Sequence, residues 1–426
     1  LSFVIIPFIS LACSNEEVYL VEPPTAFDLN REGRPCAEIT WFGSGIEDSN
    51  PIWSPDGTHI AFEGNHGCRD IYVMDSNGGN VQQLTESEGW DYNPAWSPNG
   101  EYIAFIRSFE DRSKIFLATA DGTDVQQLSF SPGTSDYGPV WSPNGEQIAF
   151  IVSALNAEPA TSLEQSTQIF SLPESSIFVS NLNGSNIRQL TTNVAVSSTL
   201  QWSPDGKKIA FASKNSETGN TDILSISSDG VDARPVLLDT FEPSYSEVFE
   251  INGEERRFMS DPDPELAWSP DGKRMIISLR HFLRDGEKGI YVMDADGTNI
   301  NKLLETDFIP DGVAWSPDGA KIFFHGLYYD GRKSNLERWS GYEMNADGSN
   351  LTALKFSFEY PDHERVLVNW SPNFDQIAFT KDGIVTVAET DGSSEISRNC
   401  PPVYPCHLSL LQSLLDREAE TELLDD

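Results

Sequence analysis

A five-residue block, Trp-Ser-Pro-Asp/Asn-Gly, recurs along most of this chain of 426 residues. Full copies begin at Trp53, Trp96, Trp141, Trp202, Trp268 and Trp315, and a seventh copy, at Trp370, has Phe374 in place of the glycine. Repeats constrain a fold strongly, because each one is a supersecondary unit that must bury its apolar surface against its neighbours. The sequence therefore predicts seven equivalent units.

Each unit consists of short segments with the alternation of β-strands. An apolar strand such as Ile60 to Phe62 follows the block, then an alternating strand such as Asp70 to Asp75, then an Asn-Gly or Asp-Gly turn and a last strand ending in Leu-Thr. Period-2 patterning between such turns indicates strands and hairpins. About four strands per repeat predict an all-β fold, a seven-bladed β-propeller of four-stranded antiparallel blades.

The block itself fits a tight turn, because proline fixes φ, aspartate bonds its own backbone and glycine closes the turn. The tryptophan before each turn is expected to end the innermost strand and fill the gap between blades, the alternative being a set of rings that stack on a ligand. The segment Asp294 to Asn299 imitates the start of a calcium loop but lacks its distal glutamate, so turn geometry explains its acids.

Ring closure is predicted from the spacing between the turn glycine and the following leucine. Gly78 and Leu84 lie six residues apart, as do Gly33 and Ile39, whereas Gly392 is followed at that distance by the charged Arg398. We therefore expect a strand at residues 38–42 to complete the seventh blade, so that no sheet edge stays open. A disulfide from Cys36 to Cys400 or Cys406 would lock this seam, but with Cys68 present the sequence does not choose among the pairings.

The ends of the chain predict export. Residues 1–13 form an apolar run that ends in Ala12-Cys13, followed at once by polar and acidic residues. This pattern resembles a bacterial lipobox in which Cys13 would be lipidated, although Leu11 lies one position nearer the cysteine than usual; a cleaved secretory signal is the alternative. We expect a linker at 14–24, the propeller at 25–399 and a tail with a short helix at 400–426. The expected location is the cell envelope, either the periplasm or the cell surface.

The charge of the chain limits its partners. It has 66 acidic and 28 basic residues, a net charge of -38. Such a surface repels phosphate backbones and anionic lipids, so we expect no nucleic-acid binding and membrane attachment only through Cys13. Neutral or basic partners remain, as does a coat of acids that serves solubility alone.

The composite of Trp-Ser-Pro-Asp-Gly, Ile-Ala-Phe, Asp-Ile-Tyr-Val-Met-Asp, Asp-Gly and Leu-Thr resembles the propeller repeats of TolB and its relatives, over about residues 25 to 398. This resemblance implies an envelope location and protein binding. TolB itself has a separate N-terminal domain and six blades, so the chain resembles its propeller without being TolB. Related propellers also cap serine peptidases, but the sequence has no G-x-S-x-G nucleophile elbow.

Insertions predict the binding face. They occupy residues 152–175, 239–264, 281–288, 325–341 and 356–366, all in loops after the second or fourth strands of the blades, whereas the opposite face has only tight turns. Long loops on a rigid scaffold are where binding usually resides, and aromatic and arginine side chains dominate binding energies. The expected protein-binding residues are Arg256, Arg257, Phe258, Tyr328, Tyr329, Arg332, Arg338, Trp339 and Tyr360. The alternative is that these aromatics form a private core beneath a lid of loops.

Two other functions stay open from the sequence. One is a propeller that binds a glycan. The other is a metal-dependent lyase similar to the propeller-type oligogalacturonide lyases, which hold a divalent metal with histidines on one face. The candidate ligands are His66, His281, His325 and His363, expected in loops of that face, although isolated loop histidines are usually surface residues. The main expectation is a binding protein without catalytic residues, cofactor or metal.

Overall fold

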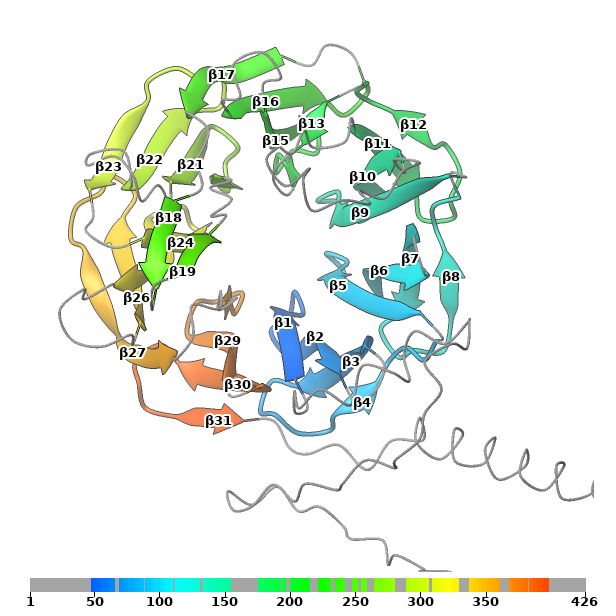
Figure 1. Ribbon diagram of the computed structural model, residues 1–426, viewed down its shortest axis with the longest axis horizontal. Coiled ribbons are helices and arrows are strands. Elements are labelled where there is room, and N and C mark those ends of the chain that lie inside the picture. Colours follow the sequence, from blue (N-terminus) through cyan, green and yellow to red (C-terminus); the bar gives the residue numbers. More distant parts are fainter. Residues whose placement is uncertain are drawn as a thin grey trace, which may run out of the picture.

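The structure, a computed structural model, is described here for residues 47–397 without the short segments 66–68, 88, 110–111, 131–132, 155–174, 193, 197–199, 215–220, 231–233, 242–246, 252–253, 259–263, 280–288, 306–308, 329–336, 361–367 and 382. Seven antiparallel sheets stand around a central axis (Figure 1), and each sheet follows the chain order from its inner to its outer strand. The predicted seven-bladed propeller is confirmed. The cysteines, the predicted signal, the linker and the tail lie outside the described residues.

The first three blades have four strands each. Blade 1 contains β1 (Glu47–Trp53), β2 (His59–Asn65), β3 (Arg69–Asp75) and β4 (Gln82–Gln83). Blade 2 contains β5 (Trp90–Trp96), β6 (Tyr102–Phe109), β7 (Arg112–Thr119) and β8 (Val125–Gln127). Blade 3 contains β9 (Thr134–Trp141), β10 (Gln147–Ala154), β11 (Ser175–Asn181) and β12 (Arg188–Gln189).

Blade 4 has an inner strand in two pieces, both paired with the same neighbour. Its strands are β13 (Ala195–Val196), β14 (Gln201–Trp202), β15 (Lys208–Lys214), β16 (Thr221–Ser227) and β17 (Arg234–Phe241). A separate hairpin follows, formed by β18 (Glu247–Ile251) and β19 (Glu254–Phe258).

The last three blades return to four strands. Blade 5 contains β20 (Glu265–Trp268), β21 (Arg274–Leu279), β22 (Gly289–Asp294) and β23 (Asn301–Glu305). Blade 6 contains β24 (Ile309–Trp315), β25 (Lys321–Tyr328), β26 (Glu337–Asn345) and β27 (Thr352–Tyr360). Blade 7 contains β28 (Asn369–Trp370), β29 (Gln376–Lys381), β30 (Ile384–Glu389) and β31 (Glu395–Ser397).

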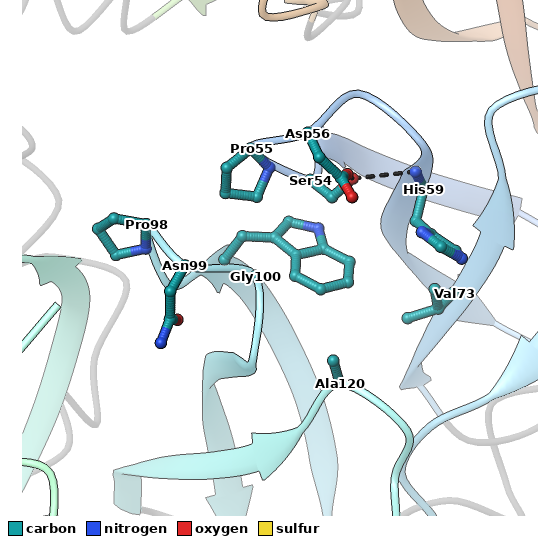
Figure 2. Close-up of a pocket in the computed structure, with 10 residues that line it drawn as sticks. Ser54, Pro55, Asp56, His59, Val73, Pro98, Asn99, Gly100 and Ala120 are labelled. Atoms are coloured by element: carbon teal, nitrogen blue, oxygen red, sulfur yellow. Dashed lines mark hydrogen bonds between the residues drawn. The ribbon is translucent and has the colours of Figure 1, made fainter.

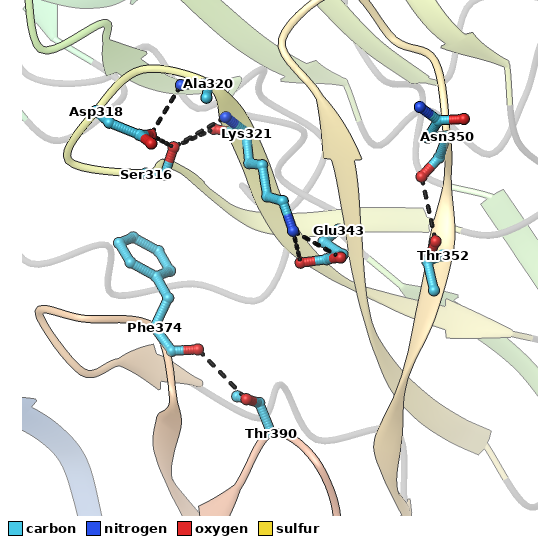
Figure 3. Close-up of polar contacts among 9 residues, drawn as sticks. All are labelled: Ser316, Asp318, Ala320, Lys321, Glu343, Asn350, Thr352, Phe374 and Thr390. Atoms are coloured by element: carbon cyan, nitrogen blue, oxygen red, sulfur yellow. Dashed lines mark hydrogen bonds and ion pairs between the residues drawn. The ribbon is translucent and has the colours of Figure 1, made fainter.

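The repeated block is the turn between the first and second strands, as predicted. Figure 3 shows the blade 6 copy, in which the Ser316 hydroxyl donates to the Asp318 carboxylate at 2.6 Å and the Ala320 amide donates to the same oxygen at 3.0 Å. These hydrogen bonds hold the pKa of Asp318 below its usual value. Gly319 closes the turn at φ +69°, a region that favours glycine. In blade 7 Phe374 takes this place at φ 62°, and its ring stacks on Phe323 with centroids 4.5 Å apart.

The Leu-Thr motif and its Leu-Ser variant fix the end of the outer strand in blades 1 to 3. In blade 1 the Leu84 amide donates to the Ile71 carbonyl at 2.8 Å, and the Ile71 amide donates to the Thr85 hydroxyl at 3.0 Å. The pairs Leu128-Ser129 and Leu190-Thr191 repeat both contacts in blades 2 and 3. The motif therefore satisfies backbone groups at the edge of a sheet whose outer strand is only a few residues long.

The seven tryptophans form the expected ring between blades. The indole Nε1 of Trp96 donates to the carbonyl of Ile52, the residue before Trp53 in the preceding blade, at 3.2 Å. The same bond, to the residue before the preceding tryptophan, is made by Trp141, Trp202, Trp268 and Trp315, and by Trp53 to Asn369 of blade 7. Trp370 departs from the rule and donates to the Gly312 carbonyl. The indoles thus satisfy their N–H groups while packing blade against blade.

Closure of the ring corrects one prediction. The outer strand of blade 7 is β31, which pairs with β30, and not the expected strand at residues 38–42, which lies outside the described residues. The charged Arg398 does not prevent a strand here, because the three-residue β31 is held by backbone pairing and its Ile396 stays exposed. Blade 7 instead joins blade 1 through a shared core that includes Trp53, Phe62 and Val385.

We predict that Trp202→Phe lowers the free energy of unfolding by about 1–3 kcal/mol, because the partly buried Val140 carbonyl loses its donor while most of the ring area is kept. Trp90→Phe is the control, since Trp90 is 37% exposed and lies outside the ring, and should change stability by less than about 0.5 kcal/mol. Urea unfolding curves of both variants measure the difference, and equal shifts would contradict a role for the indole hydrogen bond.

Candidate functional site

The face of the disc that receives the second-to-third-strand and blade-to-blade connections is called the loop face here, and a layer of buried charge lies beneath it. Its residues occupy the starts of first and third strands and the ends of second strands. They are Asp48, Glu63, Asp70, Asp91, Arg107, Lys114, Asp136, Asp311 and His325. Buried charges are costly unless paired, so their contacts show what holds this face in place.

Two ion pairs anchor blades 2 and 3. Arg107 donates from Nε and Nη2 to the two carboxylate oxygens of Asp91, each at 2.6 Å, and its guanidinium lies 4.7 Å from the ring centroid of Phe116. Lys114 of β7 donates to Asp136 of β9 at 3.0 Å and so joins blade 2 to blade 3. Bidentate pairing and stacking fix the arginine in one orientation.

We predict that Arg107→Met destabilises the fold by about 3–5 kcal/mol, because the Asp91 carboxylate is fully buried and would keep its charge without a partner. The matched change Lys321→Met removes the half-exposed ion pair to Glu343 and should cost less than about 1 kcal/mol. Denaturant midpoints compare the two variants. If the two substitutions lower the free energy of unfolding equally, the buried Arg107–Asp91 pair does not stabilise this face more than a surface pair does.

Glu63 joins blade 1 to blade 2. One carboxylate oxygen accepts from the Asn93 amide of blade 2 at 2.8 Å and from the Asn50 side chain at 3.1 Å. Asn50 and Asn93 occupy equivalent positions three residues before their tryptophans, both at positive φ, where the inner strands bulge. Asparagine tolerates this conformation better than most residues, so the bulge lets the inner strands of the two blades share one carboxylate.

Asp70 is the unusual member of the layer. It is 1% exposed and accepts a hydrogen bond from Gln83 at 3.0 Å through one oxygen, while no described residue donates a hydrogen bond to its other oxygen. Burial, reinforced by the nearby negative charge of Asp91, raises its pKa to about 8, against a usual 3.8. The folded protein therefore holds a proton on Asp70 at neutral pH.

This proton has a consequence for stability. Below pH 3.8 Asp70 is protonated in both states; as the pH rises to about 8 the unfolded chain releases the proton and the folded chain retains it, so stability falls. We predict that Asp70→Asn removes this loss and gains about 1–4 kcal/mol over the wild type between pH 5 and 8.5. Chemical unfolding at several pH values checks this, and a gain that does not grow with pH would contradict it.

Of the four histidines proposed as metal ligands, only His325 is among the described residues. His325 does not lie in a loop as expected: it is inside β25, because the second strand of blade 6 runs on to Tyr328, and it is buried, with Nε2 3.7 Å from Asp311. His66, His281 and His363 lie outside the described residues. Among the residues that the structure describes, no group of three or more histidine, cysteine, aspartate or glutamate side chains is placed to hold a metal ion.

The predicted binding residues lie mostly on strands. Arg256, Arg257 and Phe258 belong to β19 of the extra hairpin, where Arg256 pairs with Phe249. In blade 6 the predicted insertion is largely an extension of the sheet, in which Tyr328 pairs with Arg338, and Trp339 pairs with Leu327 and Phe358. Tyr360 ends β27, and Tyr329 and Arg332 lie outside the described residues. The predicted residues thus belong to two elements, the hairpin and blade 6, and in the view of Figure 1 the hairpin overlaps the region of β24, the inner strand of blade 6.

A further group was missed by the sequence analysis. Trp90, Phe109 and Tyr137 expose 37%, 43% and 37% of their surfaces at the loop-face ends of blades 2 and 3, and we call them the aromatic patch. Beside them the hydroxyls of Tyr92 and Ser113 lie 3.1 Å apart, and burial raises the pKa of Tyr92. No insertion marks these residues. The available signal was a tryptophan at the entry of one first strand, which no other repeat shares.

No helix in the described part of the chain is long and apolar enough to cross a membrane. A family model described as the TolB beta propeller domain matches residues 43–167. An uncharacterized protein of Agrobacterium fabrum is 28% identical over 253 residues, which are 53% of this chain and 76% of that protein.

Solved structures with a similar fold include enzymes. An oligogalacturonate lyase from Vibrio parahaemolyticus superposes with a TM-score of 0.58 at 15% identity over 85% of this chain and 93% of its own. A puromycin-hydrolyzing peptidase of Mycobacterium tuberculosis gives 0.56 at 14% identity over 83% of this chain, which spans only 53% of that protein. At such identities the likeness shows a shared fold, and a fold alone assigns no chemistry. The repeat, the family match over residues 43–167 and the architecture together show a seven-bladed β-propeller that is similar to the TolB beta propeller domain.

Proposed function

We propose that this protein is a non-enzymatic binding scaffold of the bacterial cell envelope that holds a protein partner through its loop face. The observation that carries the proposal is the aromatic patch, because Trp90, Phe109 and Tyr137 present large apolar surfaces on rigid strands. Aromatic side chains of this kind concentrate binding energy at protein interfaces, and a rigid base lowers the entropy lost on binding.

The structure beneath the patch supports the same function. Phe109 packs on Phe116 with ring centroids 6.3 Å apart, and Phe116 in turn lies under the guanidinium of Arg107, which Asp91 fixes. The aromatic surface therefore rests on buried ion pairs that do not need to move when a partner binds. The expected export signal at residues 1–13 and the TolB-like repeat support the envelope location.

The partner is expected to be a protein and not a nucleic acid, because the net charge of -38 repels phosphate. The arginines at 256, 257, 332 and 338 and the aromatics at 258, 328, 329, 339 and 360 would widen the contact beyond the patch. A glycan partner, or lyase activity on polyuronates, would use the same face.

We predict that the double variant Trp90→Ala/Phe109→Ala lowers partner capture at least about tenfold, because two aromatic anchors are lost. Immobilised protein incubated with an envelope extract gives the measurement, by quantitative mass spectrometry. Val125→Ala/Ile187→Ala is the control: these two side chains are equally exposed, at 37% and 41%, but belong to the outer rim. Equal losses in both variants would contradict a specific role for the patch.

Further variants separate the functional classes. Trp339→Ala, Tyr329→Ala and Arg332→Ala/Arg338→Ala should each weaken capture while leaving the unfolding midpoint unchanged. A signal on a glycan array, together with no protein capture, would show that the partner is a glycan and not a protein. Unsaturated products from polyuronates, formed only without chelator, would replace the binding function with an enzymatic one.

A further inference from the structure

The opposite face, formed by the turns after first and third strands and called the turn face here, is hollowed around the axis. A pocket of about 410 Å³ is lined there by tryptophans and prolines of blades 7, 1, 2 and 3. We call it the hub pocket; its rings are Trp53, Trp96, Trp141, Trp370, Pro55, Pro98, Pro139 and Pro372. The tight turns were expected to offer little for recognition, but they surround this hollow.

A second pocket of about 390 Å³ adjoins the first. It lies between blades 1 and 2 and shares Ser54, Pro55, Trp96 and Pro98 with the hub pocket. Figure 2 shows Pro55 and Pro98 along one side, with Val73 and Ala120 on the other. The two pockets are neighbours that share these four lining residues, and together we call them the hub groove.

The walls of the hub groove are preformed. Pro55 lies against Gly100 of the next turn, and Pro98 lies against Gly145. A Cβ atom added to these glycines would lie 3.9 and 3.6 Å from the proline Cδ. Each turn is fixed by serine and aspartate or asparagine hydrogen bonds, such as Ser54 to Asp56 at 2.6 Å. A ligand in the groove would therefore meet rigid rings, which lowers the entropy lost on binding.

Charge on the turn face is divided into two halves. Directly after the turn, blades 2, 3 and 7 carry the exposed acids Glu101, Glu146 and Asp375. Blades 4 and 5 carry Lys207 and Lys273 at the same position, and Lys208, Arg274 and Lys321 follow in blades 4 to 6. The hub groove lies in the acidic half, and Asp56 lines it.

We propose that the hub groove binds an extended basic peptide segment of a partner protein, with an aromatic or proline side chain in the groove and lysine or arginine side chains against Asp56, Glu101, Glu146 and Asp375. Proline and aromatic rings pack well on tryptophan and proline surfaces, as extended proline-rich peptides do in aromatic grooves. Asp56 lines the groove, and the exposed acids Glu101, Glu146 and Asp375 of the same half of the turn face add negative charge that attracts a cation and repels an anionic segment. This site is on the face opposite the aromatic patch and does not depend on it.

The test uses the full chain and a fluorescein-labelled peptide, Lys-Arg-Pro-Trp-Pro-Arg-Lys, with binding followed by fluorescence anisotropy. We expect saturable binding that weakens as salt is added, because screening reduces attraction between exposed charges. A charge-reversed peptide, Glu-Asp-Pro-Trp-Pro-Asp-Glu, and a peptide with alanines in place of the Pro-Trp-Pro core should both bind at least about tenfold more weakly. Equal binding of the core-alanine peptide would overturn the groove as the anchor site.

Two protein variants locate the contact. Glu101→Lys/Glu146→Lys/Asp375→Lys should weaken binding about tenfold, whereas the matched reversal Lys207→Glu/Lys273→Glu in the other half should not weaken it. Ala120→Phe fills the outer part of the groove without changing charge and should also weaken binding. Unfolding midpoints confirm that each variant is folded. No binding by the wild type at about 1 mM peptide, or unchanged affinity in the acid-reversed variant, would overturn the proposal. Trp90→Ala/Phe109→Ala should leave peptide binding unchanged, which separates this site from the loop face.

Discussion

The packing of each blade against the next is the constraint on which the rest of this structure depends. The apolar clusters do not belong to single blades: one combines Ile71 and Leu84 of blade 1 with Phe105 of blade 2, and another joins blades 7 and 1. A single blade would expose both faces of its sheet, so the blades are stable only as a closed ring. The tryptophan indoles fix the position of each blade relative to the preceding one, because each indole N–H donates to a single carbonyl of that blade.

Because the core and the indole ring hold the blades together, the residues on the two faces of the disc can differ from blade to blade. The core and the indole ring recur in every blade, whereas the strand ends on the loop face recur only in part. Asp48, Asp91 and Asp136 each stand five residues before the tryptophan of their blade, but each has a different partner. There the blades are joined by individual solutions: Glu63 with Asn93 between blades 1 and 2, and Lys114 with Asp136 between blades 2 and 3. Because these contacts are buried and paired, they hold the loop face rigid without prescribing what is exposed above it.

The fold could be predicted because its sequence motifs recur in each blade. The candidate site could not be predicted because it depends on contacts that occur only once. Every repeat carries a tryptophan block and a second turn with glycine, so each of the seven blades can be recognised separately. Asp91 recurs as Asp48 and Asp136 in the neighbouring blades, but its partner Arg107 lies 16 residues away and meets it only once β5 and β6 pair, so no local pattern marks the ion pair. His325 seemed a loop residue because the length of β25 depends on pairing with β26. The closing strand was misplaced because an outer strand needs backbone pairing and little side-chain burial.

The acids of the turn face show which part of a charge pattern the fold dictates. Asp56, Asp271 and Asp318 have a lowered pKa because serine hydroxyls and backbone amides of their own turns donate to them, so turn geometry explains their presence. The residue after the turn also contacts the turn itself. Asn99, Asn144 and Asn373 donate to Glu101, Glu146 and Asp375, whereas Asp205 and Asp271 form ion pairs with Lys207 and Lys273. The acids Glu101, Glu146 and Asp375 are therefore on one half of the face because the turns with asparagine belong to blades 2, 3 and 7. These acids stay exposed while they accept from their turns, so the same contacts that shape the turns also give this half of the face its negative charge.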